Sequence, residues 1–344
     1  MKILFLCKAS TKTGLGHLIR SRSLANQFAK QQASVNIDFT IIGESLVARL
    51  MNEVGYPYSI YEDESLLPTL GSYDVCFFDM IDISDSLFHK VSDQVQLKVS
   101  ISPIFNKMSS VDIFFNRTKY HNLPDAHLPP NIYSSLEYTI IQDACKKIKT
   151  SIYEDNLELS QFPIAVCMGG GDAANKTLNF LKSLKKCKVP ATFWVMLGEG
   201  YSHSYDQLIS EIKKNSDHEI ILAKANKSMW QILKNCILAI LPGGITTYEA
   251  AYAGLPTLNL LENEDSYFLI KELEEEKVCL YNGKINTENI ESVNSVIERL
   301  YHNRKELLMM HLNSKQLIPN ESARNIYNKC AEILNEKISR AKMS

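Results

Sequence analysis

The stretch Leu241-Pro-Gly-Gly-Ile-Thr-Thr-Tyr-Glu-Ala-Ala-Tyr-Ala-Gly-Leu-Pro-Thr-Leu258 decides the fold of this 344-residue chain. The apolar run at 237–241 lacks the alternation of a half-exposed strand, which predicts a short buried strand. A helix is predicted to begin near Thr246 or Thr247, because threonine is a good N-cap residue. Gly254 ends that helix, and a second apolar strand follows at 257–261. A strand, a glycine turn, a helix and another strand form half of a parallel α/β unit.

The glycine turn in this stretch has the features of an anion site. The helix that follows Gly243 and Gly244 presents free backbone N–H groups and the positive end of its dipole, and both favour a phosphate. Glu249 is expected in the first turn of this helix, close to a group beside that phosphate. The alternative is an ordinary turn between strand and helix, in which the glycines serve only the tight backbone geometry.

The composition is that of an ordinary globular protein. Apolar residues make up 45% and charged residues 22% of the chain, and 344 residues suit two domains better than one. The formal net charge of −2 provides no basic surface, so a nucleic-acid-binding module is excluded. The eight cysteines show no zinc spacing and lie mostly in apolar runs. That pattern is typical of small buried hydrophobic residues rather than of metal ligands or disulfides.

The sequence shows no sign of export or of membrane insertion. The N-terminal apolar core is short and lacks a cleavage site of small residues, so a signal peptide is not predicted. No apolar run approaches the roughly 18 residues that a membrane-spanning helix needs. We therefore expect a cytoplasmic protein.

His17 is the first candidate for chemistry. A buried strand is predicted at 3–7, and apolar residues at helical spacing begin with Leu18, so His17 lies where a glycine loop turns into the first helix. Gly14 and Gly16 flank it and allow a ligand to approach the backbone closely. This position faces the crevice in which α/β proteins bind ligands. The alternative is a histidine at a helix start that performs no chemistry.

Asp79 and Asn116 are further candidates, each at the end of a predicted strand. Apolar strands are predicted at 73–78 and 113–115, and these polar residues follow them directly. Both could face the same crevice, although Asp and Asn are also common turn residues. The alternation of strands and helices through this half of the chain indicates an open parallel sheet.

The second half starts a new unit with a run of three glycines. Gly169, Gly170 and Gly171 follow a strand predicted at 163–168, and Asp172 is the expected N-cap of the next helix. Such a run before a helix suits a diphosphate that is approached by backbone N–H groups. The loop is neither a Walker A loop nor a GxGxxG fingerprint, so a dehydrogenase is only weakly indicated.

The charged run at 146–158 is the expected domain boundary. We assign residues 1–148 to a first Rossmann-like domain and residues 149–344 to a second. A final helix at 323–338 carries an apolar stripe that needs a partner surface on one of the two domains. The fold class is α/β, and the glycine loops of both halves are expected to converge on one interdomain cleft.

Three motifs together resemble those of the PseG/SpsG-type nucleotide-sugar hydrolases. They are Gly14-x-Gly16-His17-x-x-Arg20, Gly169-Gly-Gly-Asp172-x-x-Asn175 and Gly243-Gly-x-Thr-Thr-x-Glu249. That family acts on UDP-2,4-diacetamido-2,4,6-trideoxy-altrose in pseudaminic acid biosynthesis and shares the GT-B fold with MurG-type glycosyltransferases. The resemblance therefore implies a GT-B fold with two Rossmann-like domains.

The resemblance also implies a role for the candidate residues. His17 would be the general base that activates water for inverting attack at the anomeric carbon, which suits a side chain that titrates near neutral pH. The leaving group would be UDP, and Glu249 would accept hydrogen bonds from its ribose. The other implied substrate-binding residues are Gly14, Gly16, Arg20, Asp79, Asn116, Gly169, Gly170, Gly171, Asn175, Gly243, Gly244, Ile245, Thr246, Thr247, Asn263 and Glu264. No metal or cofactor is implied, since N–H groups and helix dipoles would stabilise the diphosphate.

Some segments depart from the family pattern. Asp79 is followed by Met-Ile-Asp82, the strand at 97–101 leads into Ser100-Ile-Ser-Pro103, and Asn263-Glu264 stands where an Asn-Gln pair is usual. Two alternatives therefore remain beside the hydrolase. One is an inverting GT-B glycosyltransferase with the same base and the same UDP site, and the other is a non-catalytic nucleotide-sugar-binding protein.

Overall fold

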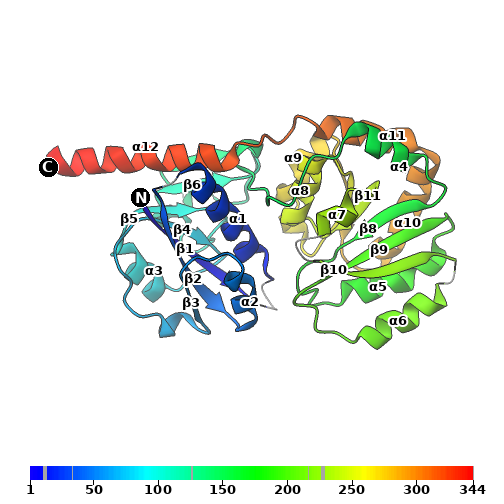
Figure 1. Ribbon diagram of the computed structural model, residues 1–344, viewed down its shortest axis with the longest axis horizontal. Coiled ribbons are helices and arrows are strands. Elements are labelled where there is room, and N and C mark those ends of the chain that lie inside the picture. Colours follow the sequence, from blue (N-terminus) through cyan, green and yellow to red (C-terminus); the bar gives the residue numbers. More distant parts are fainter. Residues whose placement is uncertain (11–13, 33, 125–126, 216, 226–228, 344) are drawn as a thin grey trace. The chain divides into compact units, whose positions relative to one another are not determined.

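The chain divides into two compact units, one formed by Met1–Gln142 with Pro319–Ser344 and the other by Asp143–Ile318. The computed structural model describes residues 1–10, 14–32, 34–124, 127–215, 217–225 and 229–343. Each unit holds one parallel β-sheet with helices packed on it (Figure 1). This architecture confirms the predicted α/β class with two Rossmann-like domains.

The first unit contains, among its described residues, a parallel sheet of seven strands in the order β3-β2-β1-β4-β5-β6-β7. The strands are β1 (Lys2–Ala9), β2 (Asn36–Gly43), β3 (Tyr58–Tyr61), β4 (Tyr73–Asp79), β5 (Val95–Ser100), β6 (Ile113–Asn116) and β7 (Asn131–Ser134). The helices are α1 (Gly16–Gln31), α2 (Leu46–Asn52), α3 (Asp85–Ser92) and α12 (Ser322–Met343). The strand order reverses between β1 and β4, as in a doubly wound fold.

The second unit repeats this topology, with six strands in its described part in the order β10-β9-β8-β11-β12-β13. The strands are β8 (Phe162–Val166), β9 (Ala191–Gly198), β10 (Glu219–Ala225), β11 (Leu238–Leu241), β12 (Thr257–Leu261) and β13 (Cys279–Lys284). The helices are α4 (Thr150–Leu157), α5 (Lys176–Ser183), α6 (Tyr205–Lys214), α7 (Met229–Leu233), α8 (Ile245–Ala253), α9 (Phe268–Glu275), α10 (Thr287–His302) and α11 (Arg304–Ser314). Here the reversal lies between β8 and β11, the strands that lead into the two glycine loops.

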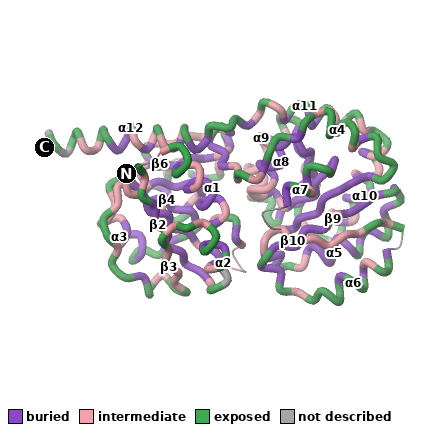
Figure 2. Tube along the Cα trace, in the orientation of Figure 1, coloured by how far each residue is buried: buried purple, intermediate pink, exposed green. Residues whose placement is uncertain are grey.

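The central strands are buried on both faces. Successive side chains of β1 alternate between two apolar clusters, with Phe5 on one face and Leu4 and Leu6 on the other. Phe5 stacks between Phe39 and Phe77, with ring centroids 5.1 and 5.0 Å apart. Figure 2 shows the same burial along the strands of both sheets. A polar side chain therefore reaches solvent from these strands only near their ends, which makes the strand ends the places for chemistry.

The C-terminal helix α12 packs on the first unit, although residues 149–344 were predicted to form one domain. Ile326 and Cys330 of α12 are buried in the core of the first unit, and the Tyr327 ring lies 5.6 Å from that of Phe28 on α1. The first unit thus ends at residue 142, earlier than predicted, and is completed by the chain from residue 319 onward. An apolar stripe shows that a helix needs a partner, but it does not identify the partner.

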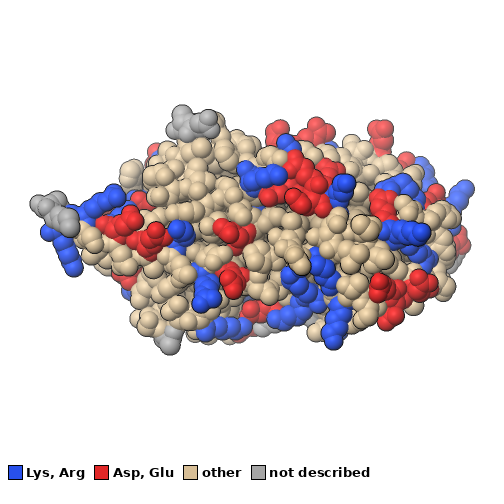
Figure 3. Space-filling model, turned by 90° about the horizontal axis from the view of Figure 1, so that it is seen from above, with Lys and Arg blue, Asp and Glu red and all other residues tan. Residues whose placement is uncertain are grey.

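The surface carries charges of both signs. On the face shown in Figure 3, lysine and arginine side chains are interspersed with aspartate and glutamate, in agreement with the formal net charge of −2. None of the helices within the described residues has both the length and the apolar character that a membrane crossing requires.

A buried histidine supports the end of α8 in the second unit. His311 of α11 has 0% exposure and stacks on Tyr153, with ring centroids 4.2 Å apart. Its Nδ1 donates to the carbonyl of Gly254, and its Nε2 accepts from the hydroxyl of Thr150 at 3.2 Å. Gly254 adopts a φ of +84°, and a Cβ atom there would lie 2.9 Å from Nδ1 of His311. The neutral ring is therefore fully hydrogen-bonded in a space that no larger residue at position 254 could share.

Acidification is expected to destabilise the second unit through His311. Burial lowers the pKa of His311; the hydrogen bond to the Gly254 carbonyl opposes this only in part, and nearby Lys315 adds to the lowering. The unfolded chain then binds the proton more readily, so stability falls as the pH drops through the normal histidine range, by at most about 1.4 kcal/mol per pH unit for one proton. Urea unfolding followed by tryptophan fluorescence tests this, because Trp194 and Trp230 both belong to the second unit. An equal pH slope for wild type and His311→Gln would contradict it.

Replacement of a buried α12 residue is expected to destabilise the first unit alone. Ile326→Asp places a carboxylate in an apolar core and should cost about 3 kcal/mol or more. The far-ultraviolet circular dichroism transition should then fall in temperature, while the tryptophan fluorescence transition of the second unit stays in place. Asn328→Asp, at an exposed position of the same helix, is the control. A joint shift of both transitions would contradict the division into units.

Candidate functional site

His17 and Asp79 meet at the carboxyl edge of the first sheet. β1 and β4 are neighbours where the strand order reverses, and Cys7 of β1 lies in register with Asp79, the last residue of β4. α1 begins at Gly16, after the loop that leaves β1, so His17 is its second residue. Open α/β sheets bind their ligands at such reversal points.

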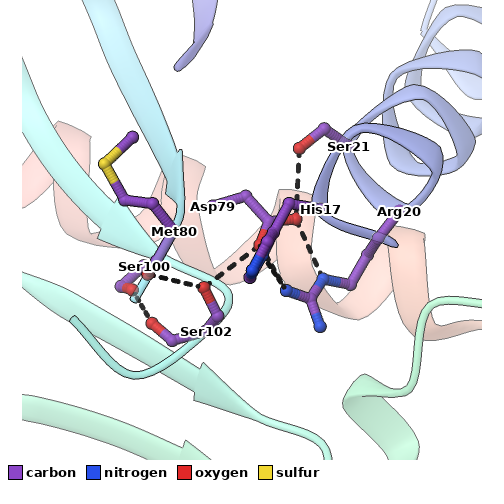
Figure 4. Close-up of polar contacts among 7 residues, drawn as sticks. All are labelled: His17, Arg20, Ser21, Asp79, Met80, Ser100 and Ser102. Carbon is purple, nitrogen blue, oxygen red and sulfur yellow. Dashed lines mark hydrogen bonds and ion pairs between the residues drawn. The ribbon is translucent and has the colours of Figure 1, made fainter. Parts of the chain in front are cut away.

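The Asp79 carboxylate is surrounded by donors from the chain itself. His17 Nδ1 lies 2.6 Å from its Oδ1 (Figure 4). Arg20, one turn along α1, donates to both oxygens, from Nε to Oδ2 at 2.9 Å and from Nη2 to Oδ1. The hydroxyls of Ser21 and Ser102 donate at 3.2 and 3.1 Å. Asp79 has no exposed side-chain surface, whereas 19% of the His17 side chain is exposed.

The electrostatics of this cluster determine which nitrogen of His17 is basic. Burial alone would raise the pKa of Asp79, but the charges and hydrogen bonds of Arg20 and His17 outweigh it and hold that pKa well below its usual range. Asp79 is thus an anion that only accepts hydrogen bonds, so the proton it shares with His17 resides on Nδ1. When the ring is neutral, its lone pair is therefore on Nε2. A buried carboxylate that fixes the tautomer of a histidine prepares it to act as a base.

The structure brings together some of the predicted residues of the first unit and separates another. Arg20 and Asp79, both predicted to bind substrate, lie buried against each other beneath His17. Gly14 has a φ of +82°, and Gly16 begins α1. Asn116 ends β6, which β5 separates from β4, and its side chain donates to the carbonyl of Tyr120 at 2.7 Å. In the structure Asn116 therefore closes its own loop and lies outside the His17 cluster.

Ser21 and Ser102 are members of this cluster that the sequence reasoning missed. Ser102 follows β5, the neighbour of β4, and its hydroxyl also lies 3.0 Å from the carbonyl of Met80. The sequence feature that could have identified Ser102 was the departure from the family pattern at Ser100-Ile-Ser-Pro103, directly after a predicted strand. Ser21 offered no such signal, because only the packing of α1 against β4 directs its hydroxyl to the carboxylate.

In the second unit, α8 starts at Ile245 with Gly244 as its N-cap, whereas Thr246 or Thr247 was predicted as the cap. Gly243 has a φ of +77° and turns the chain there, so the helix is capped two or three residues earlier than the threonine pattern suggested. No side chain caps this helix start, and its first turn holds no acidic residue. The start of α8 therefore presents backbone N–H groups without a carboxylate from the chain in front of them.

The residues after this start divide between core and surface. Thr247 is buried, and its hydroxyl donates to Oδ1 of Asn259 at 2.8 Å, while Thr246 is partly exposed. Glu249 was predicted in the first turn of the helix, but it is the fifth residue of α8 and only 2% exposed. The helix begins earlier than predicted, and this places Glu249 one turn deeper.

The glycine loop at 169–171 leads to helix α5, whose N-terminus is already occupied by a carboxylate of the chain. The Asp172 carboxylate accepts from the backbone N–H groups of Lys176 at 2.7 Å and Thr177 at 2.9 Å. Asn175, rather than the predicted Asp172, holds the N-cap position of α5, with a φ of +50°. Within the loop, Gly170 packs so tightly on Gly198 that a Cβ atom on Gly198 would lie 2.1 Å from the Gly170 carbonyl oxygen. The predicted residues Gly169, Gly170 and Gly171 therefore shape this loop, while the start of α5 is occupied.

The remaining predicted residues lie after β12. Asn263 and Glu264 are exposed, and the Asn263 side chain accepts from the backbone N–H of Asp265 at 3.1 Å, which caps a single 3₁₀ turn. Asn175 is also engaged, because its Oδ1 accepts from the Tyr201 hydroxyl at 2.9 Å. Over the described ranges, no three His, Cys, Asp or Glu side chains gather as metal ligands do.

Comparison with known proteins finds distant relatives in sequence. No family model matches the chain. It is 23% identical over 273 residues to an uncharacterized protein of Methanocaldococcus jannaschii, with 77% of this chain but 56% of that protein covered. The chain thus spans little more than half the length of this relative. It is also 23% identical over 243 residues to the UDP-2,4-diacetamido-2,4,6-trideoxy-beta-L-altropyranose hydrolase of Campylobacter jejuni, covering 66% of this chain and 82% of the hydrolase.

Solved structures match almost the whole chain at low sequence identity. HepE of Anabaena, in complex with UDP-glucose, aligns with a TM-score of 0.64 and 14% identity over 98% of this chain and all of that one. MurG of Acinetobacter baumannii aligns with a TM-score of 0.59 and 13% identity, covering 96% of this chain and all of that one. With both sheets in the doubly wound order, these matches show that the chain has the GT-B fold.

Proposed function

We propose that the protein hydrolyses a UDP-sugar at the anomeric carbon, with His17 as the general base. The observation that carries this proposal is the contact between His17 Nδ1 and the buried Asp79 carboxylate, which leaves Nε2 free to take a proton. The similarity to the Campylobacter hydrolase and the presence of UDP-glucose in the matched HepE structure support the choice of substrate.

In the proposed reaction, Nε2 of His17 takes a proton from water while the water oxygen bonds to the anomeric carbon. The bond between that carbon and the diphosphate oxygen breaks, and its electron pair leaves with UDP. The products are UDP and a free sugar with inverted anomeric configuration. Asp79 stabilises the imidazolium that forms, and in this proposal it is a positioning residue rather than a substrate contact.

The second unit would hold the nucleotide. We place a phosphate at the start of α8, where Gly244, Ile245 and Thr246 offer backbone N–H groups and a hydroxyl. The ribose hydroxyls remain the proposed partners of Glu249, which lies on the same helix. A diphosphate held in this way would be stabilised as charge develops on the leaving oxygen.

A glycosyltransferase is the second candidate, and a pocket in the first unit favours it. The pocket has a volume of about 940 Å³ and opens at the carboxyl ends of β1, β2 and β3, the same edge that carries His17. Serine hydroxyls and carboxylates dominate its lining, among them Ser10, Ser84, Glu44 and Glu62. Its size and polarity suit a hydroxyl-rich acceptor, and an acceptor hydroxyl would use His17 as water does.

UDP release from a panel of UDP-sugars without acceptor is expected, and it should depend on His17. His17→Ala should lower the rate about 10²–10⁴-fold, the range for loss of a general base. His89→Ala, an exposed histidine of α3, is the control. If UDP release requires an added acceptor, the protein is a transferase and the hydrolase proposal is wrong. Failure to bind UDP in calorimetry would refute both proposals.

Asp79→Asn is expected to lower kcat by a similar factor without weakening UDP binding. Arg20 donates to both carboxylate oxygens, whereas a neutral amide offers one acceptor oxygen to Arg20 and His17 together. The amide would therefore no longer hold the ring proton on Nδ1, and a ring that carries its proton on Nε2 lacks the basic atom, as for the triad aspartate. Asp93→Asn, at an exposed site of the same unit, is the control. An unchanged kcat in a folded Asp79→Asn protein would show that Asp79 does not set the tautomer.

A further inference from the structure

A buried lysine in the second unit has an exposed partner. Lys176, the first residue of α5, is 4% exposed, and its ammonium forms an ion pair with the Glu262 carboxylate. The Glu262 side chain is 71% exposed. Lysine is rarely buried without an opposite charge, since a buried charge must be paired. The exposed Glu262 carboxylate can move into water at little cost, whereas the buried Lys176 ammonium cannot. The ammonium therefore needs an anion beside it, but another anion can take the place of Glu262.

The two members of the ion pair follow the strands on either side of β11, which leads into the glycine turn before α8. Lys176 follows β8, Glu262 follows β12, and β11 lies between those two strands in the sheet. A Cβ atom on Gly243 would lie 2.1 Å from Cδ2 of Leu261, the residue before Glu262. The start of α5 and the segment after β12, which carry the two charges, therefore flank the end of β11, where the chain turns into α8.

The two helix starts at this edge differ in charge. Asp172 neutralises the start of α5, whereas no side chain caps the start of α8. Among the described residues around the glycine turn, Lys176 thus provides a fixed positive charge beside an uncapped helix start. An ammonium and backbone N–H groups that follow neighbouring strands at one edge of the sheet match the chemistry of a phosphate.

We propose that Lys176 is the cationic contact of the diphosphate. In the ligand-free protein the Glu262 carboxylate pairs with the Lys176 ammonium, and the diphosphate displaces that carboxylate when it binds. The inference rests on the proposed function, because it assumes that the ligand is a nucleoside diphosphate. Glu262 and the ligand then compete for one ammonium. The apparent affinity for the nucleotide is reduced by the fraction of molecules in which the carboxylate holds Lys176.

Competition predicts opposite effects for the two members of the pair. Lys176→Met removes the contact and fills the space with an apolar chain, so UDP should bind about 10- to 100-fold more weakly. Glu262→Gln removes the competitor, so UDP should bind about 2- to 10-fold more tightly. Without ligand, the same Glu262→Gln variant should unfold at a lower temperature than the wild type, because the Lys176 ammonium is left without its carboxylate. An ion pair with a purely structural role would weaken binding in both variants.

The test is titration calorimetry of the full chain with UDP and with uridine. Uridine lacks the phosphates, so its affinity should stay within about two-fold in both variants if Lys176 acts on the diphosphate. Lys182→Met, exposed on the same helix, and Glu276→Gln, exposed after α9, are the charge-matched controls. Thermal unfolding of each variant measures the cost to the ligand-free protein.

The outcomes separate this inference from the proposed function. A wild-type protein that does not bind UDP refutes the proposed function. If the wild type binds UDP, the inference fails when Lys176→Met binds UDP equally well or when Glu262→Gln binds UDP more weakly. It also fails when the affinity of a variant for uridine falls together with its affinity for UDP. Opposite shifts for UDP together with unchanged uridine affinity support it.

Discussion

The ionised carboxylate of Asp79, withdrawn from solvent at the end of β4, is the constraint on which the first unit's site depends. A charge taken out of water destabilises a fold by several kcal/mol unless it is paired and hydrogen-bonded. The compensation comes from α1, through Arg20 and Ser21, and from the segment after β5, through Ser102. The Asp79 carboxylate thus links these elements through hydrogen bonds. His17 lies one turn from Arg20 on the same helix, so the same contacts also fix its orientation.

The same sheet topology produces two different arrangements of residues in this chain. At the reversal point of the first sheet, side chains form a buried ionised cluster that prepares one imidazole. At the reversal point of the second, two glycine loops lead from β8 and β11 into the next helices. The two helix starts there are not equivalent, since Asp172 occupies that of α5 and leaves α8 as the receptive one. The proposed reaction requires a base in the first unit and an anion site in the second, and these two arrangements support that proposal.

Much of the fold could be predicted from the sequence, because the pattern of a buried parallel sheet is local. The strand at 257–261 has the predicted bounds, and other central strands differ from prediction by a few residues at their ends. β7 (Asn131–Ser134) was not predicted, since a four-residue, half-buried edge strand beside a turn-rich segment has no apolar run. Of the candidate site, His17 and Asp79 could be predicted as strand-end residues, but their contact could not.

The sequence by itself determined that the chain contains two doubly wound α/β units, with a histidine and two glycine-rich turns at the ends of buried strands. Burial of strands, helical spacing and glycine turns are properties of neighbouring residues, so the sequence displays them. Tertiary structure alone decided that Asp79 and Arg20 lie beneath His17, that Glu249 is buried, that Asp172 fills one helix start, and that α12 belongs to the first unit. These are relations between segments far apart in the chain, and they depend on charge pairing and packing in three dimensions.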